Sequence, residues 1–147
     1  MLQNTNGTTN SQFSFQTNFY IPFHEVDHAG IMFFAHLFTH AHDTYEQFMA
    51  HLELNLNRDW THEHYLLPII HAEANYHAPL HHGMTINVQL NIANIGNTSF
   101  ITEYKFLEHT EQLHAMVQLV HCCIDLHTRT AKILPNELRI KLQRYKK

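Results

Sequence analysis

This chain of 147 residues lacks several features that mark specialised classes of protein. No stretch approaches the roughly 20 apolar residues that a membrane-spanning helix needs. Residues 1–12 are mostly polar, without a basic start or an apolar segment, so we expect a flexible tail there rather than a signal peptide. The formal net charge of −4 argues against a nucleic-acid-binding protein.

Cysteine is also scarce, since the chain contains only Cys122 and Cys123. The two are adjacent within an expected strand, where neighbouring side chains point to opposite faces, so a disulfide between them is geometrically unfavourable. We therefore expect two small core residues and a reducing, cytoplasmic environment.

Basic residues are few and unevenly placed, because six of the nine Lys and Arg residues fall at or after Lys132. The simplest interpretation is the solvated face of a C-terminal helix. The alternative is a site for the anionic phosphates of a ligand.

Hydrophobic periodicity predicts one long helix and five strands. From Phe34 to Leu52 apolar residues recur at steps of three and four, which places them on one helical stripe. Elsewhere apolar and polar residues alternate, as in half-buried strands. The expected strands are Phe13–Ile21, Ile69–His77, Met84–Ile92, Phe100–Phe106 and Leu113–Leu126, and a short helix with Leu138 and Leu142 inward follows Pro135.

Short turns separate the last four expected strands, and short turns favour antiparallel neighbours because parallel crossovers need a dozen or more residues. One helix against one antiparallel sheet is a two-layer α+β domain. We expect a single domain over residues 13–147.

The most informative segment joins the first strand to the long helix. Asp27 precedes Gly30 by three residues, just before the expected helix start. A helix N-terminus presents unpaired N–H groups that can stabilise an oxyanion, and a carboxylate beside it can attack a carbonyl or activate water. The structural alternative is that Asp27 only caps the helix or its loop.

Three segments carry a resemblance to a known family. They are EVDHAGIMFFAHLFTHAHDTYEQFM at 25–49, LPIIHAEANYHAPLHHGMTINVQL at 67–90 and TSFITEYKF at 98–106. Together they resemble the 4-hydroxybenzoyl-CoA thioesterase family of hotdog proteins. Within it, the FFAH and LPIIHAE stretches look most like the 1,4-dihydroxy-2-naphthoyl-CoA hydrolases.

This resemblance implies a hotdog fold, a five-stranded antiparallel sheet wrapped around one long helix. It also implies hydrolysis of an acyl-CoA, with an aromatic acyl group expected, to free acid and CoA without a cofactor or metal. Asp27 matches the family's catalytic carboxylate, as nucleophile or general base, and the Phe34 backbone N–H matches the group that polarises the thioester carbonyl. Edge-to-edge pairing into a homodimer or homotetramer is implied, with the active site at the dimer interface.

The same fold also suits a rival function, a non-catalytic module that binds an acyl-CoA or an acyl-carrier protein. The expected substrate-binding residues for the enzyme are Gly30, His71, Arg139, Lys141 and Arg144. The three cations are chosen because coenzyme A carries phosphate charges and the body of the chain offers few positive groups to meet them.

The 16 histidines invite a metal hypothesis. His36, His40 and Asp43 share one predicted helix face opposite the apolar stripe, and two imidazoles with a carboxylate suit Zn²⁺ or Fe²⁺. All three lie on one helix, however, whereas metals usually gather ligands from several elements, so we expect no metal site. Glu46, a mid-helix carboxylate beside the stripe, is interpreted as structural.

Overall fold

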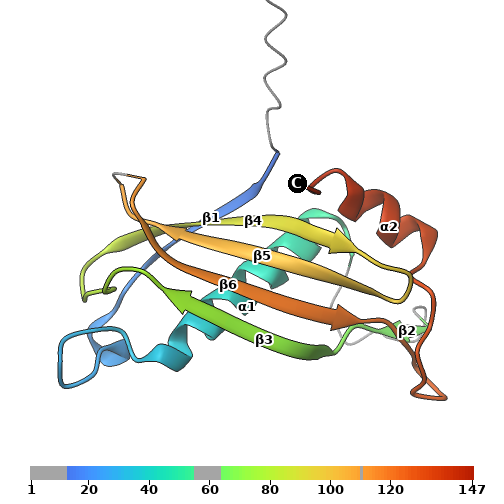
Figure 1. The fold of residues 1–147 in the computed structure, drawn as a ribbon, viewed down its shortest axis with the longest axis horizontal. Coiled ribbons are helices and arrows are strands. Elements are labelled where there is room, and N and C mark those ends of the chain that lie inside the picture. The colour runs from blue at the N-terminus through green and yellow to red at the C-terminus, as the bar shows by residue number, and fades with distance from the viewer. Residues whose placement is uncertain (1–12, 55–63, 110) are drawn as a thin grey trace, which may run out of the picture.

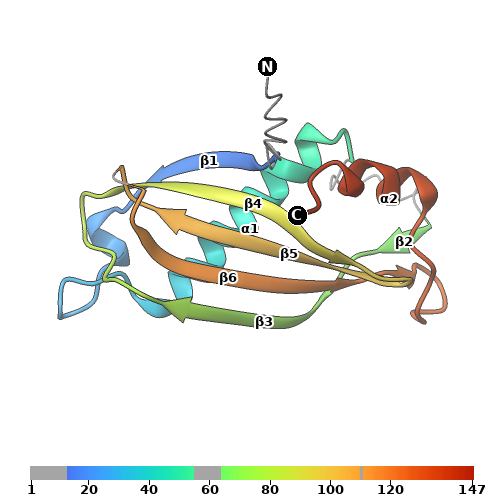
Figure 2. The same cartoon turned by 45° about the horizontal axis from the view of Figure 1, so that its top comes forward.

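The computed structural model of the protein describes residues 13–54, 64–109 and 111–147, so the tail expected over residues 1–12 lies outside it (Figure 1). Five strands form an antiparallel sheet in the order β1-β4-β5-β6-β3, and α1 lies across one face of it (Figures 1 and 2). Those elements are β1 (Phe15–Tyr20), α1 (Phe34–His51), β3 (Ile69–Tyr76), β4 (Thr85–Ile95), β5 (Ser99–Leu107) and β6 (Leu113–Cys122). The smaller elements are η1 (Phe23–Glu25), β2 (Tyr65–Leu66), β7 (Ile124–Asp125) and α2 (Asn136–Gln143).

The helical stripe predicted from the sequence packs against the sheet, with Leu37, Ala41 and Phe48 fully buried. Phe34 is the exception, since 61% of its surface is exposed. It stands in the first turn of α1, where it lines a cavity instead of entering the core. No helix among the described residues is long and apolar enough to cross a membrane.

The strand predicted over Leu113–Leu126 is interrupted. β6 ends at Cys122, and the Cys123 N–H turns away to donate to the Thr98 carbonyl at 2.7 Å. The chain then forms β7, which pairs with β2 in a separate small sheet. Both cysteines are free thiols, as predicted, with Cys123 buried and Cys122 half-buried. The sequence gives no turn signal at this point, because Cys122, Cys123 and Ile124 continue the apolar residues of β6 without Gly or Pro.

Neighbours in sequence are not always neighbours in the sheet. The short 77–84 connection predicted β3 beside β4, which is wrong, because β3 pairs with β6 at one edge of the sheet. The connection instead runs across the end of the sheet (Figure 1). At the opposite edge, residues after α2 pair with β4 just beyond the start of β1, since the Ile92 N–H donates to the Tyr145 carbonyl at 2.9 Å. Leu138 and Leu142 of α2 are buried, as predicted.

A polar group lies in the middle of the core. The His121 ring on β6 is fully buried and stacks between Tyr45 of α1 and Phe100 of β5, with centroid distances of 4.3 and 4.9 Å. Its Nε2 lies 3.3 Å from the Thr102 hydroxyl. Burial lowers the pKa of His121 to about 4, although the Leu67 backbone acts in the opposite direction.

We predict that His121 makes the protein less stable in acid. Because its folded pKa is about 4 and the unfolded value about 6.5, the unfolded chain binds more protons between these pH values. Relative to His121→Phe, the wild type should therefore lose on the order of 3 kcal/mol of unfolding free energy as pH falls from 7 to 4. Urea unfolding across that range measures the difference. Tyr45→Phe is the control, since it removes a stacking partner's hydroxyl that does not titrate there and its effect should not vary with pH.

Candidate active site

Asp27 sits in a tight hairpin turn just before α1. Its N–H donates to the Ile31 carbonyl at 2.8 Å, and the Gly30 N–H donates back to the Asp27 carbonyl at 2.9 Å. The side-chain Oδ1 accepts N–H groups from Ala29 at 2.8 Å and from Ile31 at 3.4 Å. These two hydrogen bonds to Oδ1 hold the carboxylate in place, whereas Oδ2 receives no hydrogen bond from the described part of the chain.

The turn requires a residue that tolerates positive φ. Gly30 has φ of +75°, in the left-handed region that strains residues with a Cβ. A Cβ added there would meet no atom within 4 Å. Glycine is therefore required at this position by the backbone conformation and not by the close approach of another atom of the described chain.

The hairpin is fastened to two other parts of the molecule. The Met32 N–H donates to the Leu80 carbonyl at 2.7 Å, and Ile31 bridges to His81, so the hairpin rests on the 77–84 connection. The Phe33 N–H donates to the Glu25 carbonyl at 2.8 Å, which ties the residue before α1 to η1. These bonds place Asp27 close to the N-terminus of α1.

A cavity of about 520 Å³ opens at this junction. Asp27 supplies its carboxylate, and most of the other lining groups are apolar or aromatic. They are Ile31, Met32, Phe33, Phe34, Tyr76, His77, Ala78, Pro79 and Leu80. The cavity is thus suited to a largely apolar ligand with one polar reacting group.

The first turn of α1 supplies the electropositive side of this cavity. Phe33, at the N-cap, makes no side-chain hydrogen bond to the helix, and first-turn N–H groups have no intrahelical partner. The Phe34 N–H and the positive end of the helix dipole are therefore available to an anion. The Tyr76 hydroxyl donates to the Phe34 carbonyl at 2.8 Å, which holds its ring over the same turn. Partial burial raises the pKa of Tyr76, so it remains a neutral donor at pH 7.

Of the predicted substrate-binding residues, only Gly30 lies in the hairpin itself. His71 is exposed on β3, pairs with Glu73 at 3.2 Å and is not part of the cavity wall. The cavity wall instead contains Tyr76 and His77, which follow His71 in the sequence. Tyr76 was missed by the sequence analysis, although its place at the end of a strand before the Pro79 turn was a usable signal.

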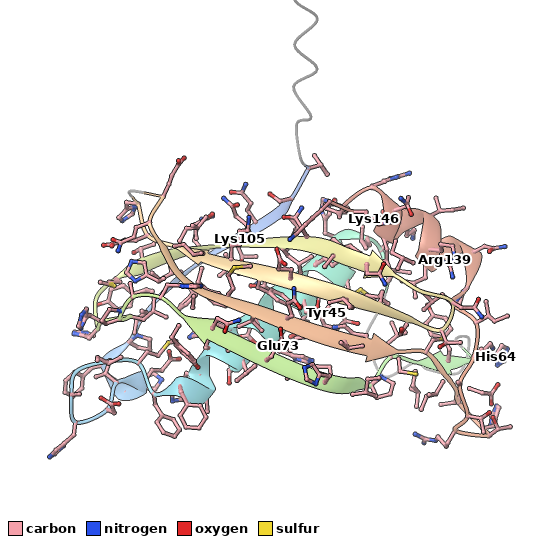
Figure 3. The ribbon with its side chains drawn as sticks, viewed as in Figure 1. Tyr45, His64, Glu73, Lys105, Arg139 and Lys146 are labelled. Carbon is pink, nitrogen blue, oxygen red and sulfur yellow. The ribbon has the colours of Figure 1, made fainter. Side chains whose placement is uncertain are left out.

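The three predicted phosphate-binding cations belong to α2 and its C-cap, and α2 lies at the other end of the sheet (Figure 1), where Figure 3 labels Arg139. Arg139 donates to the Gly96 carbonyl at 2.9 Å, and Lys141 donates to the Leu52 carbonyl at 2.7 Å, where α1 ends. Arg144 is exposed at the end of α2. β4 alone has 11 residues, so at about 3.3 Å per residue the ends are separated by roughly 30 Å. Within one chain these cations do not approach the cavity.

The structure separates the three residues of the metal hypothesis. His40 turns towards the first strand and stacks on Phe19, whereas Asp43 lines a second cavity of about 410 Å³ between α1 and β3. No cluster of three His, Cys, Asp or Glu side chains with metal-binding geometry occurs among the described residues. Glu46 is exposed and belongs to neither cavity.

Comparison with known proteins identifies relatives along most of the chain. The family model of the thioesterase-like superfamily matches residues 21–142. A 1,4-dihydroxy-2-naphthoyl-CoA hydrolase from Synechococcus elongatus is 33% identical over 84% of this chain and 90% of its own length. The crystal structure of a 1,4-dihydroxy-2-naphthoyl-CoA thioesterase from Synechocystis superposes with a TM-score of 0.81 at 26% identity, covering 89% of this chain and 96% of that one. The fold is therefore the hotdog fold, as the resemblance implied.

A Staphylococcus aureus protein solved in complex with CoA has the same fold. Its TM-score is 0.83 at 18% identity, over 91% of this chain and 84% of that one.

We predict that Gly30→Ala destabilises the hairpin without a steric clash. The left-handed conformation costs a residue with a Cβ about 1–2 kcal/mol, and there is free space for the methyl group. Urea unfolding should show a loss of about that size in Gly30→Ala. Gly30→Asn should lose less, because Asn tolerates positive φ better. Equal losses in the two variants would show that something other than backbone conformation matters at this position.

Proposed function

The chain belongs to the thioesterase-like superfamily, and on that premise we propose that it hydrolyses an acyl-CoA thioester in the cavity beside Asp27. The observation that carries the proposal is the pairing of two groups in one cavity. A carboxylate with an unoccupied oxygen lies beside the uncapped N-terminus of α1. Hydrolysis of a thioester needs both a base or nucleophile and a stabilised oxyanion.

In the proposed reaction the thioester carbonyl oxygen accepts the Phe34 N–H, which stabilises negative charge as the carbonyl carbon becomes tetrahedral. Asp27 either removes a proton from a water that attacks that carbon, or attacks it through Oδ2 to form an acyl anhydride that water then hydrolyses. The C–S bond breaks, and the sulfur leaves with its electron pair and takes the proton that the water has released. The water oxygen ends in the carboxylic acid, so the products are free acid and CoA.

The cavity favours an aromatic acyl group. Phe33, Phe34 and Tyr76 present ring surfaces there, and Met32 and Leu80 add flexible apolar contacts. Two solved or curated relatives carry names that specify 1,4-dihydroxy-2-naphthoyl-CoA, which has a bicyclic aromatic acyl group. A thiol-release assay over a panel of acyl-CoAs should therefore give higher kcat/KM for aromatic than for straight-chain aliphatic substrates.

The non-catalytic binding module is the weaker candidate. A module that only holds an acyl group has no use for a carboxylate with a free oxygen facing an apolar cavity, because burying such a charge against the ligand costs binding energy. The placement of Asp27 favours the enzyme for that reason. Arg139, Lys141 and Arg144 are not included in the proposed site, because two of them already bind backbone carbonyls at the far end of the sheet.

We further propose that the active unit is a homodimer paired through β3. This strand lies at an edge of the sheet, where one row of backbone groups lacks a strand partner in the described chain, and Ile70 is 64% exposed. Tyr76 belongs to both β3 and the cavity wall, so a copy added at this edge would cover one side of the cavity. In an antiparallel pairing, the Ile69 end of the partner strand lies beside the Tyr76 end of this one. The second cavity, lined by Ile69 and Asp43, would then adjoin the first across the interface.

We predict that Asp27→Asn reduces kcat by at least about 100-fold, the usual scale for a positioned acid–base or nucleophilic group. The amide keeps the turn-forming oxygen, so the hairpin and the fold should be retained. Asp125→Asn is a matched control, because the Asp125 carboxylate also accepts two loop N–H groups, from His127 and Thr128, at the other end of the molecule. Near-normal turnover in Asp27→Asn would show that Asp27 has only a structural role in the turn.

We also predict that Ile70→Lys disrupts the dimer, since a charge on the paired edge opposes strand addition. Light scattering coupled to size exclusion should show monomers, and activity should fall with dissociation. Ile140→Lys is the control, because Ile140 is similarly exposed, at 61%, but lies on α2. A dimer that persists in Ile70→Lys would place the interface elsewhere.

A further inference from the structure

Glu25 and His40 form an almost buried pair that the proposed chemistry does not use. Glu25 Oε2 lies 2.7 Å from His40 Nε2, and each side chain is only 11% exposed. The His40 ring stacks on Phe19 of β1 with a centroid distance of 3.7 Å and an interplanar angle of 11°. Because the carboxylate can only accept, His40 Nε2–H donates. Burial of such polar groups is costly unless they are paired, so the contact is energetically significant.

The pair joins two parts of the site. Glu25 ends η1, two residues before Asp27, and its main-chain carbonyl accepts the Phe33 N–H at the start of α1. His40 stands on α1 itself, between the cavity end and the middle of the helix. Glu25 therefore holds the N-cap residue through its backbone and the body of the helix through its side chain. Neither residue lines the cavity beside Asp27.

We propose that Glu25 and His40 are positioning residues. Their side-chain contact fixes the position of the Asp27 hairpin relative to the first N–H groups of α1, a relation called the register below. The inference rests on the proposed thioesterase function, since that register matters only if the carboxylate and the oxyanion site act on one carbonyl. The other contacts of the hairpin, from Met32 to Leu80 and from Ile31 to His81, join it to the 77–84 connection and not to α1. Misplacement of catalytic groups by about 1 Å can cost on the order of 100-fold in rate, so even a small slip of the hairpin should be measurable.

Steady-state kinetics tests the proposal with three variants. Glu25→Ala and His40→Phe break the hydrogen bond, and the phenyl ring preserves the stack on Phe19. Each should lower kcat about 10-fold or more with KM changed less than about 2-fold, because these residues contact no substrate. Glu25→Gln can still accept from His40, so it should retain most of kcat. The double variant Glu25→Ala/His40→Phe should lose little more than either single variant, since both remove the same contact.

Thr44→Val provides a matched structural control. The Thr44 hydroxyl bonds Thr17 at 2.8 Å, which joins α1 to β1 one turn beyond His40 without touching the hairpin. This variant should lower the melting temperature but leave kcat unchanged. An equal fall of kcat in Thr44→Val, or additive losses in the double variant, would overturn the proposal, because the effect would then be general packing of α1.

Hydrogen–deuterium exchange supplies a readout that does not depend on activity. Backbone amides of residues 26–33 should exchange faster in Glu25→Ala and His40→Phe than in the wild type or Thr44→Val. Unchanged exchange there would overturn the positioning role even if kcat fell. Faster exchange with normal kcat would also overturn it, by showing that register does not limit the reaction. Absence of thiol release by the wild type from every acyl-CoA would instead overturn the proposed function, so the two failures are distinguishable.

Discussion

The unpaired N-terminus of α1 is the constraint around which the rest of the molecule is arranged. A helix whose body is buried must still leave its first N–H groups without intrahelical partners, and Phe33 provides no side-chain cap. Those groups therefore need water, a ligand or another part of the chain. In this protein the Phe33 N–H donates to the Glu25 carbonyl, and the next N–H belongs to Phe34, which lines a cavity with a mostly apolar wall. The exposure of Phe34 is a consequence of that position at the rim.

The sheet topology creates the cavity. β3 pairs with β6 instead of β4, so the chain must cross the end of the sheet between residues 77 and 84. This crossing segment brings Leu80 to the Met32 N–H and places His77 and Pro79 opposite the Asp27 hairpin. The same arrangement leaves β3 at an edge, with Tyr76 at once on that edge and on the cavity wall. Catalytic geometry and an available pairing surface thus arise from one feature of the strand order.

Histidine has several distinct environments in this chain, which explains why its abundance does not indicate one site. His121 is neutral in the core between two aromatic rings, and burial holds its pKa far below the usual range. His40 is paired with a carboxylate, and His71 is exposed beside Glu73. The basic residues also have separate structural roles. Arg139 donates to the Gly96 carbonyl in the turn between β4 and β5, and Lys141 donates to the Leu52 carbonyl at the end of α1. Residue counts alone therefore predict neither a metal centre nor a phosphate site.

The sequence by itself determined the elements that depend on local periodicity and on residues near in the chain. The stripe on α1, apart from Phe34, and the alternation in β4 are properties of short segments, and both are present where predicted. The hairpin of Asp27 and Gly30 likewise depends on residues that are near in the chain. Tertiary structure alone decided which strands became neighbours, where the apolar run after Leu113 changed partner, and which residues met Asp27 across the cavity. Tyr76 and Glu25 owe their places to contacts with residues 42 and 15 positions away. Local propensity carries no information about such distant contacts, because they are selected by the packing of the whole sheet against α1.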